Sequence, residues 1–304
     1  MKTSIIGYPR IGALRELKFA SEKYFRQEIT AEELLETAKN IRLKSRTVQK
    51  ENGIDYIPSN DFSFYDNMLD AAVLMNAVPE RYRALELPEL DTYFAMARGY
   101  QGKNGDVKAL AMKKWFNTNY HYMVPGIDDS TEIKLAGTKP FDEFLEAQKS
   151  GIKTKPVIIG AFTFLKLARF TGNKSIADFA DAVSSAYCNY LAKLSELGAE
   201  WAEFDEPYLV TDLSAEDISL FVLLYNTKEP LNKKHSNKRI HVPKTRMTNY
   251  TIIPQKTSFF HVFPPQMRSI TLKRADLPLG WAKIFLNTLH HKQIYTRKQY
   301  IQFI

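Results

Sequence analysis

The sequence of 304 residues has a single cysteine, Cys188. One thiol excludes an intramolecular disulfide and any cysteine-based metal cluster, and it is typical of a protein from a reducing compartment. No apolar run comes near the ~20 residues that span a bilayer. The apolar stretch at the N-terminus is also too short for a signal peptide. These absences predict a cytoplasmic protein that has no membrane partner.

Acidic residues almost disappear after Thr227. Residues 228–304 hold 15 Lys or Arg against two acids, Glu229 and Asp276, and therefore carry a net charge of +13. The whole chain is +8, which leaves residues 1–227 at −5. We therefore divide the chain into a folded unit, 1–227, and an aberrant basic tail, 228–304, which we expect to be disordered or loosely packed.

The composition of the tail has two interpretations. A shift of reading frame in an A/T-rich gene would explain its Lys, Asn, Ile, Phe and Tyr bias, and we favour this origin over a new domain. The alternative is nucleic-acid binding, in which the basic run 233–239 contacts phosphates and aromatic side chains such as Tyr250 and Phe259 stack on bases. Charge runs usually mark a solvated surface, and no nucleic-acid-binding motif is present, so we do not expect this partner.

Residues 1–227 alternate between expected strands and helices. A capping box at Thr30–Glu33 opens a helix that ends at Asn52. The best-defined unit is Lys153–Pro207, where two apolar runs of strand length flank a helix that begins at Ser175. The strands that we expect are 4–7, 54–58, 156–160 and 201–204, and the first is followed by a helix with Leu14, Leu17 and Tyr24 on its inner face. This rhythm predicts the α/β class, as a barrel or an open doubly wound sheet.

Polar side chains follow three of these strands directly. They are Arg10, Asn60-Asp61 and Asp205-Glu206. A barrel would place all of them at its carboxyl-terminal mouth, where barrel enzymes bind their substrates. We therefore favour a (β/α)8 TIM-barrel-like domain, incomplete because the strand–helix rhythm stops at Thr227.

Four strings of residues, in this order, resemble the first half of cobalamin-independent methionine synthases. They are Gly7-Tyr8-Pro9-Arg10-Ile11-Gly12 with Arg15-Glu16-Leu17-Lys18, the string SNDFSFYD at 59–66, MKKWFNTNYHY at 112–122, and WAEFDEP at 201–207. The third string is the most specific, because so long a run rich in aromatic residues and Asn is improbable by chance. The resemblance covers roughly residues 1–227.

This resemblance implies a methyltransferase of methionine biosynthesis, which transfers a methyl group from a 5-methyltetrahydrofolate polyglutamate to homocysteine. The family is built from two (β/α)8 barrels and carries zinc and the homocysteine site in the second. This chain is similar to the first barrel only, so the resemblance implies that the zinc ligands are absent and that no catalytic residue lies in it. It further implies that the folate is bound by Arg15, Glu16, Leu17, Lys18 and Lys114.

The charges of these residues suit a polyglutamate tail, which is a string of carboxylates. Arg15 and Lys18 lie on the first turns of a helix after a glycine loop, where cations and free N–H groups act together, and Lys114 adds a third cation. Taken alone, the same residues fit a solvated helix face equally well. We expect a monomer that binds the folate, is inactive alone, and meets homocysteine only with the second barrel. A further alternative is a non-catalytic barrel that docks on a separate catalytic half.

Three other candidates have a structural interpretation that we favour. Asp205 and Glu206 are adjacent carboxylates that could have split pKa values, but consecutive residues of a strand point to opposite faces. His121 lies among aromatic residues and is expected to be a hydrogen-bonded structural histidine. Cys188 lies on the inner side of an amphipathic helix and is expected to be a small buried apolar residue.

Overall fold

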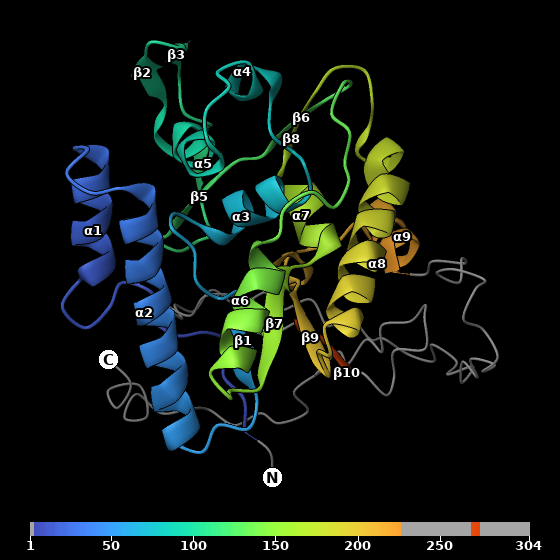
Figure 1. Ribbon diagram of the computed structural model, residues 1–304. Coiled ribbons are helices and arrows are strands. Elements are labelled where there is room, and N and C mark those ends of the chain that lie inside the picture. Colours follow the sequence, from blue (N-terminus) through green and yellow to red (C-terminus); the bar gives the residue numbers. More distant parts are fainter. Residues whose placement is uncertain (1–2, 226–268, 274–304) are drawn as a thin grey trace.

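The computed structural model describes residues 3–225 and the strand 269–273. Its largest sheet has four strands in the order β1 (Ile57–Ser59), β7 (Thr154–Ile159), β9 (Trp201–Asp205) and β10 (Ser269–Lys273). The first three are parallel, and β10 pairs antiparallel with β9 (Figure 1). The α/β class expected from the sequence is confirmed for the described residues.

Helices separate the parallel strands along the chain. They are α1 (Glu16–Phe25), α2 (Ala31–Glu51), α3 (Asn67–Leu74), α4 (Glu80–Arg83), α5 (Glu89–Arg98), α6 (Lys139–Lys149), α7 (Ala161–Leu167), α8 (Ala180–Glu196) and α9 (Ala215–Tyr225), with short 3₁₀ helices at Ile176–Phe179 and Pro207–Val210. Three small two-stranded sheets pair β2 (Tyr100–Gly102) with β3 (Gly105–Val107), β4 (Met112–Lys114) with β5 (His121–Met123), and β6 (Gly126–Asp128) with β8 (Arg169–Thr171). The strand–helix rhythm of the sequence is therefore present.

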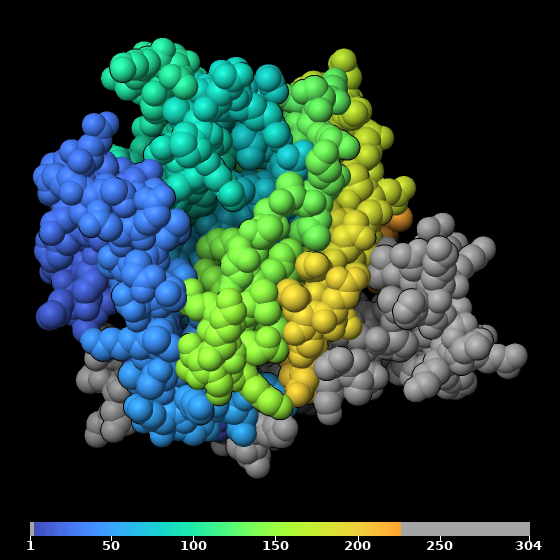
Figure 2. Space-filling view, viewed as in Figure 1, coloured from blue at the N-terminus to red at the C-terminus, as the bar shows by residue number. Residues whose placement is uncertain are grey.

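One face of the central sheet lies under a layer of helices. In Figures 1 and 2, α2, α6 and α8 lie side by side, blue, green and yellow. Ion pairs from Arg42 and Arg46 to Glu146 join α2 to α6, and the ring contact of Phe141 with Tyr190 joins α6 to α8. This layer leaves the carboxyl ends of the parallel strands accessible.

The unit around β7 and β9 forms as the sequence predicts. All six residues of β7 are buried, which explains its apolar run without alternation. On α8, Tyr187 and Tyr190 are buried, and their rings pack on Phe204 of β9 at centroid distances of 5.5 and 6.2 Å. A capping box of Ser175 and Asp178 begins the 3₁₀ helix that leads into α8. Aromatic packing on one helix face thus fixes the crossover between the two strands.

Two expectations for the N-terminal segment are wrong. The strand expected at 4–7 is only a single parallel bridge between Ser4 and Tyr56, because Gly7 and Pro9 turn the chain away from the sheet. Leu14, expected on the inner face of the first helix, is 78% exposed. It precedes α1, which begins only at Glu16 after a turn with positive φ at Arg15.

The described strands form an open sheet, and a closed eight-stranded barrel is not among them. Within the four-stranded sheet, β1, β7 and β9 are the parallel strands, and parallel strands are what a barrel of this kind requires. The antiparallel strand β10 comes from the tail, where no strand was expected, although the sequence Ser-Ile-Thr-Leu-Lys alternates polar and apolar residues as a strand does. The expected disorder of the rest of the tail lies outside the described residues.

A search of the described helices for a membrane span finds none of the required length and apolar character.

Candidate functional site

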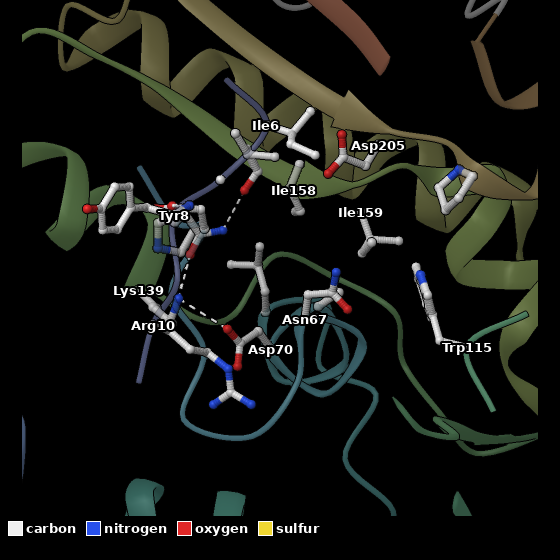
Figure 3. Close-up of a pocket in the computed structure, with 18 of the residues that line it drawn as sticks. Ile6, Tyr8, Arg10, Asn67, Asp70, Trp115, Lys139, Ile158, Ile159 and Asp205 are labelled. Atoms are coloured by element: carbon white, nitrogen blue, oxygen red, sulfur yellow. Dashed lines mark hydrogen bonds and ion pairs between the residues drawn. The ribbon is translucent and has the colours of Figure 1, made fainter. Parts of the chain in front are cut away.

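A cavity of about 480 Å³ opens at the carboxyl ends of β1, β7 and β9 (Figure 3). All the polar residues expected at such a mouth line it, namely Arg10, Asn60, Asp61, Asp205 and Glu206. The prediction that they lie together is confirmed. A volume of this size suits a small molecule, and the carboxyl edge of parallel strands is where α/β proteins bind ligands.

Lys139, at the start of α6, is a centre of polar contacts on one wall of the cavity. Its Nζ lies 3.1 Å from Asp70 Oδ2 and 3.0 Å from Glu143 Oε1, and it donates a hydrogen bond to Asn60 Oδ1 at 2.8 Å. The neighbouring carboxylates Asp70 and Glu143 raise the pKa of Lys139 despite its burial. This lysine is therefore charged and fully paired, and it joins α6 to α3 and to the end of β1.

Behind this wall lies a buried ion-pair network. Arg46 on α2 contacts Glu143 and Glu146 on α6, each at 2.9 Å, and Arg42 contacts Glu146 at 2.6 Å. Lys139, Arg42 and Arg46 together hold the pKa of the Glu143 carboxyl below its usual value even though its burial acts in the opposite direction. Breaking one partner of such a buried pair costs about 3–5 kcal/mol, so the network fixes the cavity wall.

The loop after the Ser4 bridge forms another wall. Arg10 donates hydrogen bonds to the carbonyl oxygens of Ser63, Phe64 and Tyr65, so its guanidinium is used in structure. Asp61 accepts one hydrogen bond, from the Tyr8 backbone N–H at 2.9 Å. Burial, and after it the charge of Glu143, raises the pKa of Asp61 to about 6.

The adjacent carboxylates at the end of β9 have different environments. Glu206 is buried and accepts hydrogen bonds from the Phe162 and Thr163 N–H groups at the start of α7, and from the hydroxyls of Thr163 and Tyr225. Gly160 leaves no room for a Cβ atom beside this carboxylate. The structural interpretation therefore holds for Glu206.

Asp205, by contrast, faces the cavity, where Figure 3 shows its carboxyl group near Ile6 and Ile158. Among the described residues, no hydrogen bond or ion pair to its side chain is found. Burial raises the pKa of Asp205 to about 8, with a further contribution from Glu203 and Glu206 and an opposing one from Lys155. The two carboxylates therefore do not act as one pair, as the alternation of strand side chains suggests.

The residues expected to bind folate lie elsewhere, outside the lining of this cavity. Arg15 caps α1 in a left-handed conformation, with φ of 62°, and its side chain is exposed. Lys18 is exposed and lies 3.8 Å from Glu22. Leu17, in contrast, is buried against Ala38 and Ile41, so its side chain anchors the helix.

Glu16 closes the turn before α1. Its carboxylate accepts a hydrogen bond from the Leu14 N–H at 2.9 Å and occupies the space beside Gly12, which has φ of 83°. Hydrogen bonds from the Glu16 and Leu14 backbone N–H groups lower the pKa of the Glu16 carboxyl. The acid therefore shapes the loop that presents Arg15.

Lys114 lies on the hairpin of β4 and β5, opposite His121, and both side chains are exposed. The neighbouring Trp115 and Tyr120 reach the cavity, so this specific string contributes to its rim. The expected structural hydrogen bond of His121 is not found in the described part of the chain. His121 is exposed on the hairpin, where its ring needs no partner from the protein.

Comparison with known protein families shows to which family the chain belongs. The family model described as "Cobalamin-independent synthase, N-terminal domain" matches residues 2–247. The chain belongs to this family. Its match extends twenty residues beyond Thr227.

Curated relatives of the chain are named 5-methyltetrahydropteroyltriglutamate–homocysteine methyltransferases. Those of Streptococcus sanguinis and Streptococcus suis are each 59% identical, over 225 and 227 residues, which is 74% and 75% of this chain and 30% of each relative. The enzyme of Campylobacter jejuni subsp. doylei is 58% identical over 234 residues, 77% of this chain and 31% of its own length. The chain thus spans about 30% of the length of these relatives.

The described residues contain no cluster of the kind that binds zinc. No group of three or more His, Cys, Asp or Glu side chains in that part has the arrangement of metal ligands. Cys188 is only partly buried on α8, less than expected.

Sequence reasoning missed several residues of the cavity. They are Tyr8, Asn67, Asp70, Trp115, Tyr120 and Lys139. Tyr8, Trp115 and Tyr120 lie inside the strings that resemble cobalamin-independent methionine synthases. Their place in these strings was the one sequence feature that could have indicated a role at the site. Lys139 and Asp70 meet from positions 69 residues apart, and nothing local in the sequence indicates that contact.

Proposed function

We propose that this chain is the folate-binding portion of a methionine synthase, in which Arg15, Lys18 and Lys114 bind the glutamate tail of a 5-methyltetrahydropteroyl polyglutamate. The single observation that carries the proposal is that Arg15, Lys18 and Lys114 are all exposed in a chain that belongs to this family. In the described part of the chain, Arg15 and Lys114 have no ion-pair or side-chain hydrogen-bond partner, and the 3.8 Å contact of Lys18 with Glu22 is solvent-exposed. Their charges are available for carboxylates.

The start of α1 supports this assignment. The N-cap residue Arg15 makes no side-chain cap hydrogen bond, and the partial positive charge of a helix N-terminus favours an anion. Charge-assisted hydrogen bonds of this kind contribute about 1.5–3 kcal/mol each when they are partly desolvated. In the proposal Glu16 and Leu17 keep the turn and the helix in place, and Arg15 and Lys18 contact the ligand.

We further propose that the sheet is the first half of a (β/α)8 barrel. The Ser4 bridge, β1, β7 and β9 follow one another in chain order, all parallel, as the first four strands of a barrel do. Residues 1–227 are then the binding unit. Transfer of the methyl group to homocysteine requires the polypeptide that the relatives carry beyond this third of their length, together with its zinc.

Calorimetric titration of the full chain with 5-methyltetrahydropteroyltriglutamate tests the proposal. We expect the triglutamate to bind at least tenfold more tightly than the monoglutamate, and the preference to weaken as salt is raised. Arg15→Gln and Lys18→Gln should each lower the triglutamate affinity about tenfold, which corresponds to ~1.4 kcal/mol. Binding of the monoglutamate should change little.

Lys103→Gln is the matched control, because Lys103 is an exposed cation in the turn between β2 and β3. Its affinity for the triglutamate should equal that of the unmodified chain. Equal affinity for the two folates, or an unchanged affinity in the Arg15→Gln, Lys18→Gln double variant, would contradict the proposal.

A further inference from the structure

The cavity at the carboxyl ends of β1, β7 and β9 has more acidic groups than its own cations satisfy. Lys139 already pairs with Asp70, and Arg10 binds three backbone carbonyl oxygens. Glu206 accepts four hydrogen bonds from α7, Thr163 and Tyr225. What remains available to a ligand is therefore Asp205, with no side-chain partner in the described residues, and Asp61, with one N–H group from Tyr8.

The rest of the lining favours an apolar body. Ile6 and Ile158 lie near Asp205, and Ile159 and Trp115 lie further along the wall (Figure 3). Tyr120 and Tyr8 add aromatic surface at other points of the wall. Aromatic faces attract cations within about 6 Å, so the walls and the free carboxylates favour the same kind of ligand.

We propose that this cavity binds a small organic cation, a primary ammonium ion on a short apolar body, with its charge held by Asp205 and assisted by Asp61. The ammonium group supplies the donors that these carboxylates lack. The apolar body fills part of the 480 Å³ beside the isoleucines and Trp115. The inference is independent of the folate proposal, because none of the residues assigned to folate lines the cavity.

Ionisation of Asp205 is the condition for this binding. Glu203, Glu206 and burial act against it, and Lys155, which forms a buried ion pair with Glu203, acts in its favour. Asp61 is a further acid of the same cavity, and Lys139 and Arg10 face it with their charges already paired or bonded. A bound cation lowers the pKa of a nearby carboxyl, so the ligand and the ionised form of Asp205 stabilise each other.

The test is a titration of the full chain at pH 8.5 with 2-phenylethylammonium. Binding is monitored by the NMR signal of the Trp115 indole N–H, which is assigned by its absence in a Trp115→Phe variant. The neutral analogue 2-phenylethanol and the anion 3-phenylpropionate are titrated in parallel. We expect saturable binding of the ammonium ion at millimolar concentration, and at least tenfold weaker binding of both analogues.

Asp205→Asn should weaken the ammonium affinity at least tenfold, and Asp61→Asn should weaken it by a smaller factor. Asp106→Asn is the control, since Asp106 is an exposed acid on β3 far from the cavity lining, and it should leave the affinity unchanged. Circular dichroism checks that each variant is folded. Equal binding of alcohol and ammonium, no saturable binding, or full affinity in a folded Asp205→Asn variant would overturn the inference.

Discussion

At the scale of the residue, Asp205 and Glu206 show how neighbours in a sequence acquire different roles. Glu206 accepts N–H groups from the start of α7, where the helix N-terminus favours an anion. Asp205 lies next to it on the cavity side and has no such donors in the described part of the chain. Its pKa of about 8 means that the folded protein holds a proton that the unfolded chain releases near pH 4.

Asp205→Asn therefore gives a pH-dependent gain in stability. Between pH 5 and 8 the free energy of unfolding of the unmodified protein should fall relative to the variant, because Asp205 ionises only in the unfolded chain over this range. Above pH 8 the difference should be constant at a few kcal/mol in favour of the variant, since each unit of pKa shift corresponds to ~1.4 kcal/mol. Urea denaturation at a series of pH values measures it.

The exposed acid Asp106 again provides the control, and Asp106→Asn should follow the unmodified protein at every pH. Parallel stability curves for the Asp205→Asn variant and the unmodified chain would show that Asp205 ionises normally in the folded state.

The sequence indicated only part of this site. Arg10, Asp61 and Asp205 could be predicted, because each follows a strand expected from the sequence and the carboxyl ends of parallel strands meet at one edge. The pairing of Lys139 with Asp70 could not, since it depends on how α6 and α3 pack. Neither could the use of Arg10 as a donor to three backbone carbonyl oxygens, which holds its guanidinium against residues 63–65.

At the scale of the element, local signals were reliable wherever the chain satisfies its own backbone. The Thr30 capping box forms as expected, with Glu33 N–H bound to the Thr30 hydroxyl and the Glu33 carboxylate bound to the Thr30 N–H. The inner face of α2 is not wholly apolar. Arg46 and Gln49 are buried beside Leu34, Ala38 and Ile41, because α6 has acids that pair with Arg46.

Thr30→Ala should reduce the free energy of unfolding by about 1 kcal/mol, because the Glu33 N–H at the start of α2 loses the hydroxyl that accepts its hydrogen bond. Thr37→Ala is the matched control on the same helix, where the hydroxyl bonds only to the Glu33 carbonyl and alanine has the higher helix propensity. That change should be neutral or slightly stabilising. Similar losses for the two variants in urea denaturation would rule out a specific role for the cap.

At the scale of the whole molecule, only part of the central sheet could be predicted from the sequence. The order of β1, β7 and β9 follows from the strand–helix alternation, since right-handed crossovers place successive parallel strands side by side. The antiparallel strand β10 could not be predicted, because a five-residue alternation in a basic segment does not specify its partner. Its pairing covers the edge of β9 that a further parallel strand would otherwise extend.

Ile270→Pro tests this pairing in the intact chain. Proline removes a ladder hydrogen bond and cannot occupy the interior of a paired strand without loss. Hydrogen exchange at the amides of β9 that face β10 should accelerate at least tenfold. The amides of β1, which pairs with β7 and lies two strands away from β10, are the internal control and should exchange at an unchanged rate. An unaltered rate throughout β9 would show that β10 does not protect this edge.

Gly160 follows β7 and is the N-cap residue of α7, and it lies beside the Glu206 carboxylate. The place where its side chain would begin is filled by the Glu206 carboxylate, so even a methyl group would push that acid away from the start of α7. Any other side chain at this position therefore displaces the carboxylate that accepts the N–H groups at the start of α7. We therefore expect that nearly all natural nucleotide changes in this codon are synonymous. An amino-acid substitution of Gly160 in a related gene would indicate that its product is no longer under selection to fold.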